Sequence, residues 1–154
     1  MDYTIEPMSR PNMREVLEIE LASNTIEDPD FGSVPTLNLW TELEFAKYGK
    51  KKNTFGMVIK EGDSVIGFCV YEKKQDKLVI DKLVVHPLFR RSKFGTILIT
   101  YAMAEHNVKV YQFVVRETDT ESIEFYKTFK FKSRLSAKHF PDGEDAILFY
   151  KVKF

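Results

Sequence analysis

The sequence predicts one α/β domain built around a mixed, mostly antiparallel sheet. A short strand pattern and two helix patterns come first, a run of short strand patterns follows, and helices and strands then alternate to the end. A nearly continuous apolar run over 108–115 adds to this, because such a run is typical of a strand buried on both faces. The 154 residues show no repeat and no linker, so we assign residues 1–154 to a single domain.

The composition is that of an ordinary globular protein, with 44% hydrophobic and 30% charged residues. The 23 basic and 23 acidic residues cancel, which argues against broad binding to nucleic acid. The N-terminus lacks a signal-peptide pattern, and no apolar run approaches the roughly 18–20 residues of a membrane span. Cys69 is the only cysteine, so a disulfide within the chain is excluded. We expect a cytoplasmic protein with no nucleic-acid partner and no membrane contact.

The first fifty residues carry one strand pattern and two helix patterns. Residues 3–8 alternate like a short strand, and Ser9 precedes a helix with apolar residues at helical spacing. Residues 24–35 are rich in Asp, Pro, Gly and Ser and predict a loop. Residues 37–48 have the spacing of a second helix.

From residue 54 the period changes to that of strands. The pattern predicts a three-stranded meander over 54–60, 64–73 and 77–85, with tight turns at Gly62 and at 74–76. The short connections between these strands predict antiparallel neighbours.

The last third alternates between helices and strands. A strongly periodic helix is predicted over 94–105, followed by the apolar strand over 108–115 and a short helix over 120–129. Two final strands are predicted over 131–135 and 145–152.

The most informative stretch is VVHPLFRRSKFGT, residues 84–96, where a strand ends at Pro87 and a basic turn leads into a helix. Backbone N–H groups at a helix N-terminus, together with the helix dipole and nearby cations, can hold a diphosphate. The turn is neither a Walker A motif nor a three-glycine Rossmann loop. It therefore predicts a site for an anionic cofactor, although a helix that merely starts with basic residues remains the alternative.

Two later motifs extend this pattern. Residues 116–126 run from an Arg to a Tyr, and residues 129–131 read Phe-Lys-Phe. Together with the basic turn at 90–95 they resemble the GNAT acetyltransferase superfamily, whose turn reads Arg/Gln-x-x-Gly-x-Gly/Ala and whose later motifs are Arg-x-x-Asn-x-x-Ala-x-x-x-Tyr and Leu-Gly-Phe. Residues 16–20 and 140–149 are similar to protein N-terminal acetyltransferases of the ribosomal-protein alanine type.

The resemblance implies a GNAT-like domain with about seven strands and about four helices. The strands 77–85 and 108–115 would be parallel and splayed at their ends, with the cofactor wedged between them. The implied reaction is acetyl transfer from acetyl-CoA to a primary amine by direct attack in a ternary complex, in a monomer or a homodimer. We expect the acceptor to be a protein or peptide α-amino group. A small-molecule amine, or a catalytically silent fold that binds CoA or a partner protein, stays open.

The resemblance also implies roles for single residues. The backbone at 83–85 would hold the pantetheine arm and the acetyl carbonyl, and the N–H groups at 91–96 would hold the pyrophosphate. Tyr126 would donate a proton to the CoA thiolate; its alternative is packing beside Ile123 and Phe129. The implied cofactor-binding residues are Leu83, Val84, Val85, Arg90, Arg91, Ser92, Lys93, Phe94, Gly95, Thr96, Asp119, Ser122 and Tyr126.

The chain departs from the family pattern at four positions. Lys93 and Lys130 stand where the family has glycine. If the position of Lys93 requires a left-handed backbone, the cost is roughly 1 kcal/mol, and pairing of its ammonium with phosphate would offset it. Lys130 replaces the glycine that usually ends the last helix in that conformation. Asp119 replaces an Asn and exchanges a donor for an acceptor. Val114 stands where related N-terminal acetyltransferases carry a Glu or His base, and a valine cannot take a proton.

Three solutions for the missing base remain. Asp81 shares a strand face with Leu83 and Val85 and is our predicted base, while Glu20 on the first helix is a second candidate. An amine that arrives neutral needs only a water path and no dedicated base.

The aromatic residues of the second helix pattern have two possible roles, and the histidines do not form a cluster in the sequence. Trp40, Phe45 and Tyr48 on the second helix pattern could pack in the core or line the acceptor site, and residues 139–141 could face them. The three histidines are scattered, and no set of residues shows metal-ligand spacing, so no metal is predicted.

Overall fold

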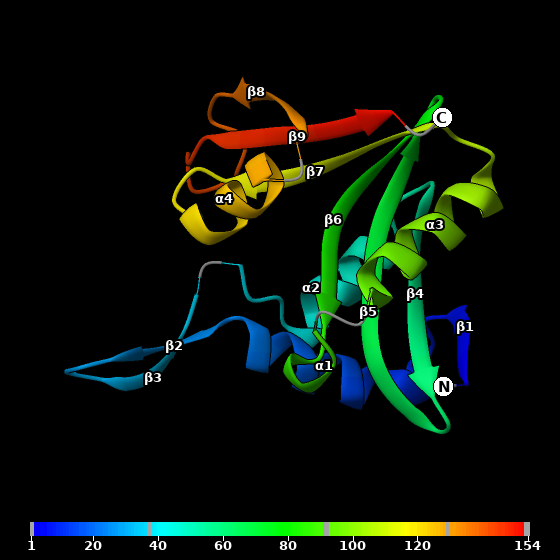
Figure 1. Ribbon diagram of the computed structural model, residues 1–154. Coiled ribbons are helices and arrows are strands. Elements are labelled where there is room, and N and C mark those ends of the chain that lie inside the picture. The colour runs from blue at the N-terminus through cyan, green and yellow to red at the C-terminus, as the bar shows by residue number, and fades with distance from the viewer. Residues whose placement is uncertain (1, 37, 91–92, 129, 153–154) are drawn as a thin grey trace. The chain divides into compact units, whose positions relative to one another are not determined.

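The computed structural model describes residues 2–36, 38–90, 93–128 and 130–152. Within these residues a seven-stranded sheet has the order β1-β4-β5-β6-β7-β9-β8, and β6 and β7 form its parallel pair (Figure 1). A second, two-stranded sheet pairs β2 with β3. The predicted class, a mixed and mostly antiparallel sheet with four helices, is confirmed.

The strands are β1 (Tyr3–Pro7), β2 (Thr25–Asp28), β3 (Gly32–Pro35), β4 (Thr54–Glu61), β5 (Ser64–Lys74), β6 (Lys77–Val85), β7 (Val110–Arg116), β8 (Lys132–Ser136) and β9 (Ala146–Val152). The helices are α1 (Met13–Ser23), α2 (Glu42–Gly49), α3 (Phe94–His106) and α4 (Thr120–Thr128), with short 3-10 turns η1 (Arg10–Asn12) and η2 (Pro87–Phe89). The chain divides into two compact units, Met1–Val70 with Lys82–Ala102 and Tyr71–Asp81 with Met103–Phe154. The single-domain assignment stays a prediction.

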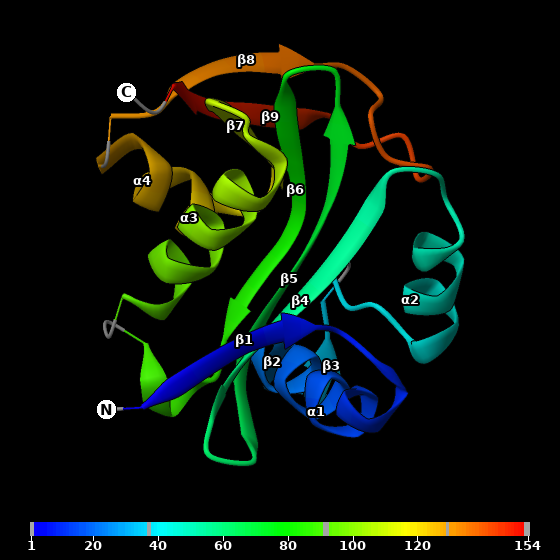
Figure 2. The same ribbon diagram turned by 90° about the vertical axis from the view of Figure 1, so that its right-hand side faces the viewer.

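The core of the first unit lies between α1, α2 and the strands β4 and β5 (Figure 2). Its fully or nearly fully buried members are Val16, Ile19, Phe45, Tyr48, Val58, Val65, Phe68 and Val70. Each such side chain contributes about 1.5–3 kcal/mol through burial. Trp40 packs edge-on against Phe45 with ring centroids 5.2 Å apart, so the aromatic residues of this region serve as packing groups.

The predicted loop over 24–35 is wrong, because this segment forms the hairpin β2–β3. Ile26 and Val34 face each other across the two strands. The carboxylate of Asp28 accepts N–H bonds from Asp30 at 2.8 Å and Phe31 at 3.0 Å, and these bonds close the turn. The Asp, Pro and Gly residues that predicted a loop belong to this tight turn, and the strands flanking it are only four residues long.

The second helix begins later than the sequence predicts, at Glu42 rather than at residue 37. A capping box fixes this start. The N–H of Glu44 donates to the Thr41 hydroxyl at 3.3 Å, and the Glu44 carboxylate accepts from the N–H of Thr41 at 3.2 Å.

The second unit is built around β7, which pairs in parallel with β6 and antiparallel with β9. The parallel ladder joins Lys77–Ile80 of β6 to Val110–Phe113 of β7. The ladder with β9 runs the whole length of β7, from Val110 to Arg116. Helix α4 places Tyr126 against Phe113, Phe131 and Phe149, so one aromatic cluster joins the helix to the sheet.

Helix α4 ends at a left-handed residue, and this residue is Lys130, which stands where the family pattern has glycine. Lys130 has a φ of 60°, its N–H donates to the carbonyl of Lys127, and the N–H of Phe131 donates to the carbonyl of Tyr126. This is the Schellman pattern, in which a left-handed residue closes the helix. A lysine there carries the steric cost that glycine avoids.

Replacing Lys130 by glycine is therefore expected to raise the free energy of unfolding by about 0.5–1 kcal/mol. Urea unfolding measures the change. Lys132→Gly is the matched control, because Lys132 is an exposed residue of β8 and glycine weakens a strand there. Equal losses of stability in both variants would contradict the assigned backbone strain.

Candidate active site

The predicted site residues are divided between the two units. The first unit contains Leu83, Val84, Val85, Arg90, Lys93, Phe94, Gly95 and Thr96, and the second contains Asp81, Asp119, Ser122 and Tyr126. Arg91 and Ser92 lie outside the described residues.

The end of β6 is held tightly by its neighbour β5. A Cβ at Gly67 would lie 3.0 Å from the carbonyl oxygen of Val84 and 3.3 Å from a methyl group of Ile59, so only glycine fits there without displacement. The N–H of His86 donates to the carbonyl of Ile66 at 2.8 Å. Sequence analysis missed this role of Gly67, although a glycine inside a strand pattern is a known sign of close backbone approach.

Two side chains of the basic turn are engaged within the protein. The guanidinium of Arg90 donates to the carbonyl of Val85 at 3.3 Å and to the hydroxyl of Ser23 at 3.1 Å. Phe94 is 4% exposed, and its ring packs edge-on near the rings of Tyr3 and Phe89. Arg90 is therefore held to β6 and α1, and Phe94 anchors the start of α3.

Lys93, which stands where the family pattern has glycine, adopts a left-handed backbone conformation with a φ of 65°. Its carbonyl accepts the N–H of Ile97 at 3.0 Å, which makes Lys93 the residue from which α3 starts. The first N–H groups of a helix, here those of residues 94–96, have no acceptor within the helix, and the helix dipole is positive at this end. With the exposed ammonium of Lys93 beside them, these donors fit a pyrophosphate.

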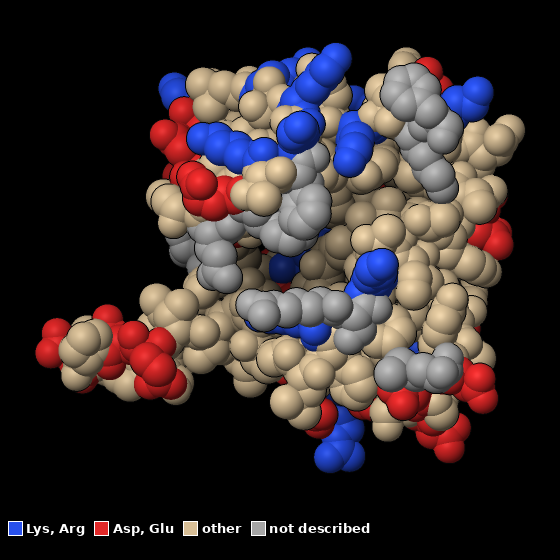
Figure 3. Space-filling model, in the orientation of Figure 1, with Lys and Arg blue, Asp and Glu red and all other residues tan. Residues whose placement is uncertain are grey.

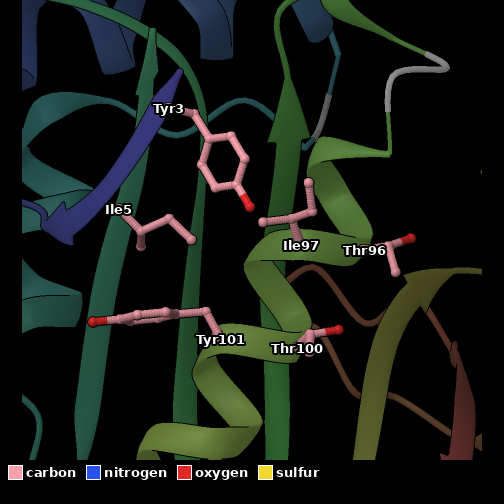
Figure 4. A pocket seen from close by; sticks show the side chains of 6 residues that line it. All are labelled: Tyr3, Ile5, Thr96, Ile97, Thr100 and Tyr101. Carbon is pink, nitrogen blue, oxygen red and sulfur yellow. The ribbon is translucent and has the colours of Figure 1, made fainter. Parts of the chain in front are cut away.

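A hollow of about 440 Å³ lies between β1 and α3 in the same unit (Figure 4). Its lining consists of Tyr3, Ile5, Thr96, Ile97, Thr100 and Tyr101. It offers neither a carboxylate nor an imidazole, so it has no group suited to take a proton from an amine near neutral pH.

In the second unit, Tyr126 is a packing residue that also carries a protonated phenol. Its ring stacks on Phe113 with centroids 4.7 Å apart and lies 5.1 Å from the ring of Phe149. Burial first, and then the Asp119 carboxylate and Tyr111, raise the pKa of the Tyr126 phenol above its ordinary value. The phenol therefore keeps its proton at neutral pH and is a hydrogen-bond donor, and the same shift makes it a weaker acid than an exposed tyrosine.

Asp119 acts as the cap of α4. Its carboxylate accepts the N–H of Ser122 at 3.2 Å, and its carbonyl accepts the N–H of Ile123 at 3.1 Å. An Asp at the N-cap stabilises a helix by about 1 kcal/mol. Asp119, which stands where the family has Asn, therefore has a structural role as the cap of α4.

The candidate bases differ in their surroundings. Asp81 is half-buried on β6, directly after the ladder with β7. Glu20 is fully buried and forms an ion pair with Lys82, and the same carboxylate oxygen accepts the N–H of Trp40 at 2.9 Å. Among the described residues the other oxygen of Glu20 has no hydrogen-bond partner. Val114 lies on β7, as predicted, and offers no proton acceptor.

Lys82 is the partner that sequence analysis missed. Its ammonium also donates to the carbonyl of Asn38, and it lies 5.0 Å from the ring centre of Trp40. The alternation of β6 places Lys82 on the face opposite to Asp81 and Leu83. Glu20 is thus part of a buried charged network.

Other chemistries find no support in the part of the chain that the structure describes. It contains no group of three His, Cys, Asp or Glu side chains that could hold a metal ion. Burial raises the pKa of the Cys69 thiol to about 12, so Cys69 stays protonated and is a poor nucleophile. No helix among the described residues is long and apolar enough to cross a membrane.

Comparison with known proteins identifies the family. Residues 15–131 match the model of the acetyltransferase (GNAT) family, so the chain belongs to that family. Members of the family use acetyl-CoA as co-substrate, and this chain is accordingly an acyltransferase by family. A search of curated proteins gave no match.

Solved structures share the fold at low sequence identity. Ard1 from Thermoplasma volcanium is 22% identical with a TM-score of 0.72, over 100% of this chain and 99% of that chain. The ribosomal-protein-S18-alanine N-acetyltransferase from Escherichia coli is 19% identical with a TM-score of 0.69, over 99% and 96% of the two chains. A mutant of the spermidine N-acetyltransferase SpeG from Vibrio cholerae is 14% identical with a TM-score of 0.64, over 98% and 94%.

Proposed function

We propose that this protein transfers the acetyl group of acetyl-CoA to the α-amino group of a protein or peptide, by direct attack in a ternary complex. The observation that carries the proposal is Tyr126, a half-buried phenol whose ring packs against Phe113 and Phe149 on the helix where the family pattern has its tyrosine. Bound acetyl-CoA supplies an acetyl thioester that an amine can attack.

The first unit would hold the cofactor through main-chain groups. The N–H groups at the start of α3, the left-handed turn at Lys93 and the lysine's ammonium form the proposed pyrophosphate site. The backbone of Leu83, Val84 and Val85 is the proposed partner of the pantetheine arm. An N–H of this strand would donate to the carbonyl oxygen on which negative charge develops.

Tyr126 supplies the proton that balances the reaction. As the new N–C bond forms and the C–S bond breaks, the sulfur takes up the electron pair of that bond. Tyr126 donates its phenolic proton to this sulfur, and the amine loses one proton to Asp81 or to water. That proton returns through solvent to the Tyr126 phenolate, so the enzyme is unchanged after each turnover. Asp81 is preferred to Glu20, because Asp81 is half-buried whereas Glu20 is fully buried and out of reach of an acceptor.

The lack of a base at Val114 favours an α-amino group as acceptor. An α-amine has a pKa of about 7.7–8.0, so a useful fraction is neutral at cellular pH, whereas a lysine side chain has a pKa of about 10.4. An enzyme without a strong base thus acts more readily on an N-terminus than on a lysine.

The charge of the N-terminal segment favours a cationic acceptor. Residues 15–46 contain eight Asp and Glu residues and neither Lys nor Arg. Three of these carboxylates, Glu27, Asp28 and Asp30, gather at the end of the β2–β3 hairpin (Figure 3). Because this charge would also attract a polyamine, a small cationic amine is the second candidate acceptor.

The test compares three kinds of acceptor by the CoA that each releases. Peptides with a free N-terminal alanine, the same peptides with a blocked N-terminus and one lysine, and a set of polyamines are supplied with acetyl-CoA. We expect turnover on the free N-terminus and little on the blocked control. Turnover confined to the polyamines would overturn the peptide assignment and support the second candidate. Transfer to none of them would favour a silent fold.

A further inference from the structure

Arg116, at the last position of β7, organises a cluster of charged groups in the second unit. Its guanidinium donates to the carboxylates of Asp142 and Glu144, both at 2.8 Å, and lies 3.9 Å from the ring centre of Phe140. These four residues and Thr118 form what we call the Arg116 cluster. It joins the end of β7 to the segment between β8 and β9.

Glu144 is the member of the cluster that reaches towards α4. One of its oxygens accepts from Arg116, and the other accepts from the N–H of Thr118 at 3.0 Å and from the Thr118 hydroxyl at 2.6 Å. Asp119, which caps α4, follows Thr118 directly, and its N–H donates to the carbonyl of Arg116 at 2.9 Å. The Glu144 carboxylate is therefore the side chain that binds Thr118 in the turn from which the helix of Tyr126 starts, beside the main-chain bonds of that turn.

Asp142 has a more limited set of contacts. Its carboxylate accepts hydrogen bonds from the guanidinium of Arg116 and from the N–H of Glu144, the latter at 2.9 Å. These bonds join the β8–β9 segment to Arg116 and to itself. Its side chain is 41% exposed, against 15% for Glu144. A hydrogen bond from Thr118 first, and then Arg116, lower the pKa of Glu144, so its charge persists at neutral pH.

Three rings hold the ring of Tyr126 in the second unit. Phe113 and Phe149 lie against its faces, and Phe131 meets it edge-on with centroids 5.2 Å apart. The start of α4 adds to these contacts, because it sets where along the helix axis the residue lies. Tyr126 stands six residues after Thr120, which is about 9 Å along the helix.

We propose that Glu144 is a positioning residue for Tyr126, acting through the Thr118 turn, whereas Asp142 only holds the loop. This inference rests on the proposed role of Tyr126 as proton donor. Glu144→Gln keeps the shape of the side chain but replaces one acceptor oxygen with a donor that faces either Arg116 or Thr118. The turn then loses its anchor, and the phenol shifts from its productive place.

A double-mutant cycle separates positioning from general stability. Glu144→Gln is expected to lower kcat about 10-fold or more in the native background, and to have little further effect once Tyr126 is replaced by Phe. Asp142→Asn, the matched control, is expected to leave kcat within about twofold in both backgrounds. Equal losses from Glu144→Gln in both backgrounds would overturn the inference and leave the proposed function intact.

Two further measurements keep the outcomes distinct. Full activity of Tyr126→Phe would instead overturn the proton-donor role itself, whatever Glu144 does. If Glu144→Gln fails to fold, Thr118→Val tests the same link, because it removes only the hydroxyl bond.

The NMR signal of Tyr126 in protein with isotope-labelled tyrosine is expected to move in Glu144→Gln and to stay in Asp142→Asn. An unmoved signal in Glu144→Gln contradicts positioning even without any turnover.

Discussion

Replacing Tyr126 by phenylalanine is expected to lower kcat by about 10²–10⁴-fold, the range of general acid catalysis by a positioned side chain. The substitution removes the proton that the leaving sulfur needs and keeps the ring that stacks on Phe113 and Phe149. Steady-state release of CoA measures the loss. The thermal midpoint is expected to change little, because the packing surface is retained.

Tyr111→Phe is the matched control for this substitution. Tyr111 lies in the same aromatic cluster, with its ring 6.0 Å from that of Phe113, and burial also raises the pKa of its phenol. We expect it to retain the native rate. An unchanged rate in Tyr126→Phe, or equal losses in both variants, would show that the assigned donor is wrong.

The pH dependence of the rate follows from the direction of the shift at Tyr126. An acid acts in its protonated form, which exists below its pKa, and burial moves that pKa above the ordinary value of about 10. The native rate is therefore expected to show no fall caused by this phenol between neutral pH and about pH 10.

The largest effect on stability is expected at the buried pair of Glu20 and Lys82. Lys82→Met is expected to lower the free energy of unfolding by about 3–5 kcal/mol, because it leaves the Glu20 carboxylate buried without its counter-charge. The exposed fractions of the two side chains are 7% for Lys82 and 0% for Glu20, so water cannot replace the lost ammonium. Urea unfolding measures the difference.

Two comparisons sharpen this second prediction. The double variant Glu20→Leu with Lys82→Met is expected to regain most of the stability, since no buried charge is left unpaired. Arg14→Met removes a pair whose side chains are 90% and 64% exposed, and is expected to cost less than about 1 kcal/mol. A loss from Lys82→Met no greater than that from Arg14→Met would contradict the buried ion pair.

Strands and helices whose ends are marked by residues close by in the sequence were predicted well. Strand β6 begins and ends at the predicted residues, 77 and 85, because its apolar pattern is bounded by a tight turn and a proline. The β2–β3 hairpin was missed, because its strands are only four residues long and its turn dominates the composition. The family pattern also marked Lys93 and Lys130 as lysines at glycine positions and left their backbone open, and the structure has a positive φ at both.

The charged networks could not be predicted from the sequence. Arg116 and Glu144 are 28 residues apart, and their meeting depends on how β9 pairs with β7. The contact between Glu20 and Lys82 likewise requires α1 to pack on the face of β6 that carries Lys82. Side-chain pairs of this kind follow from tertiary structure, whereas helix and strand periods follow from the residues nearby.

As a member of the acetyltransferase (GNAT) family, the protein is expected to bind acetyl-CoA and to act on it. Isothermal titration calorimetry of the full chain with acetyl-CoA measures this binding, at two temperatures so that a vanishing enthalpy at one of them is not mistaken for no binding. We expect saturable binding of one acetyl-CoA per chain, weakened when Lys93 is replaced by Glu. Absence of binding heat at both temperatures would contradict it.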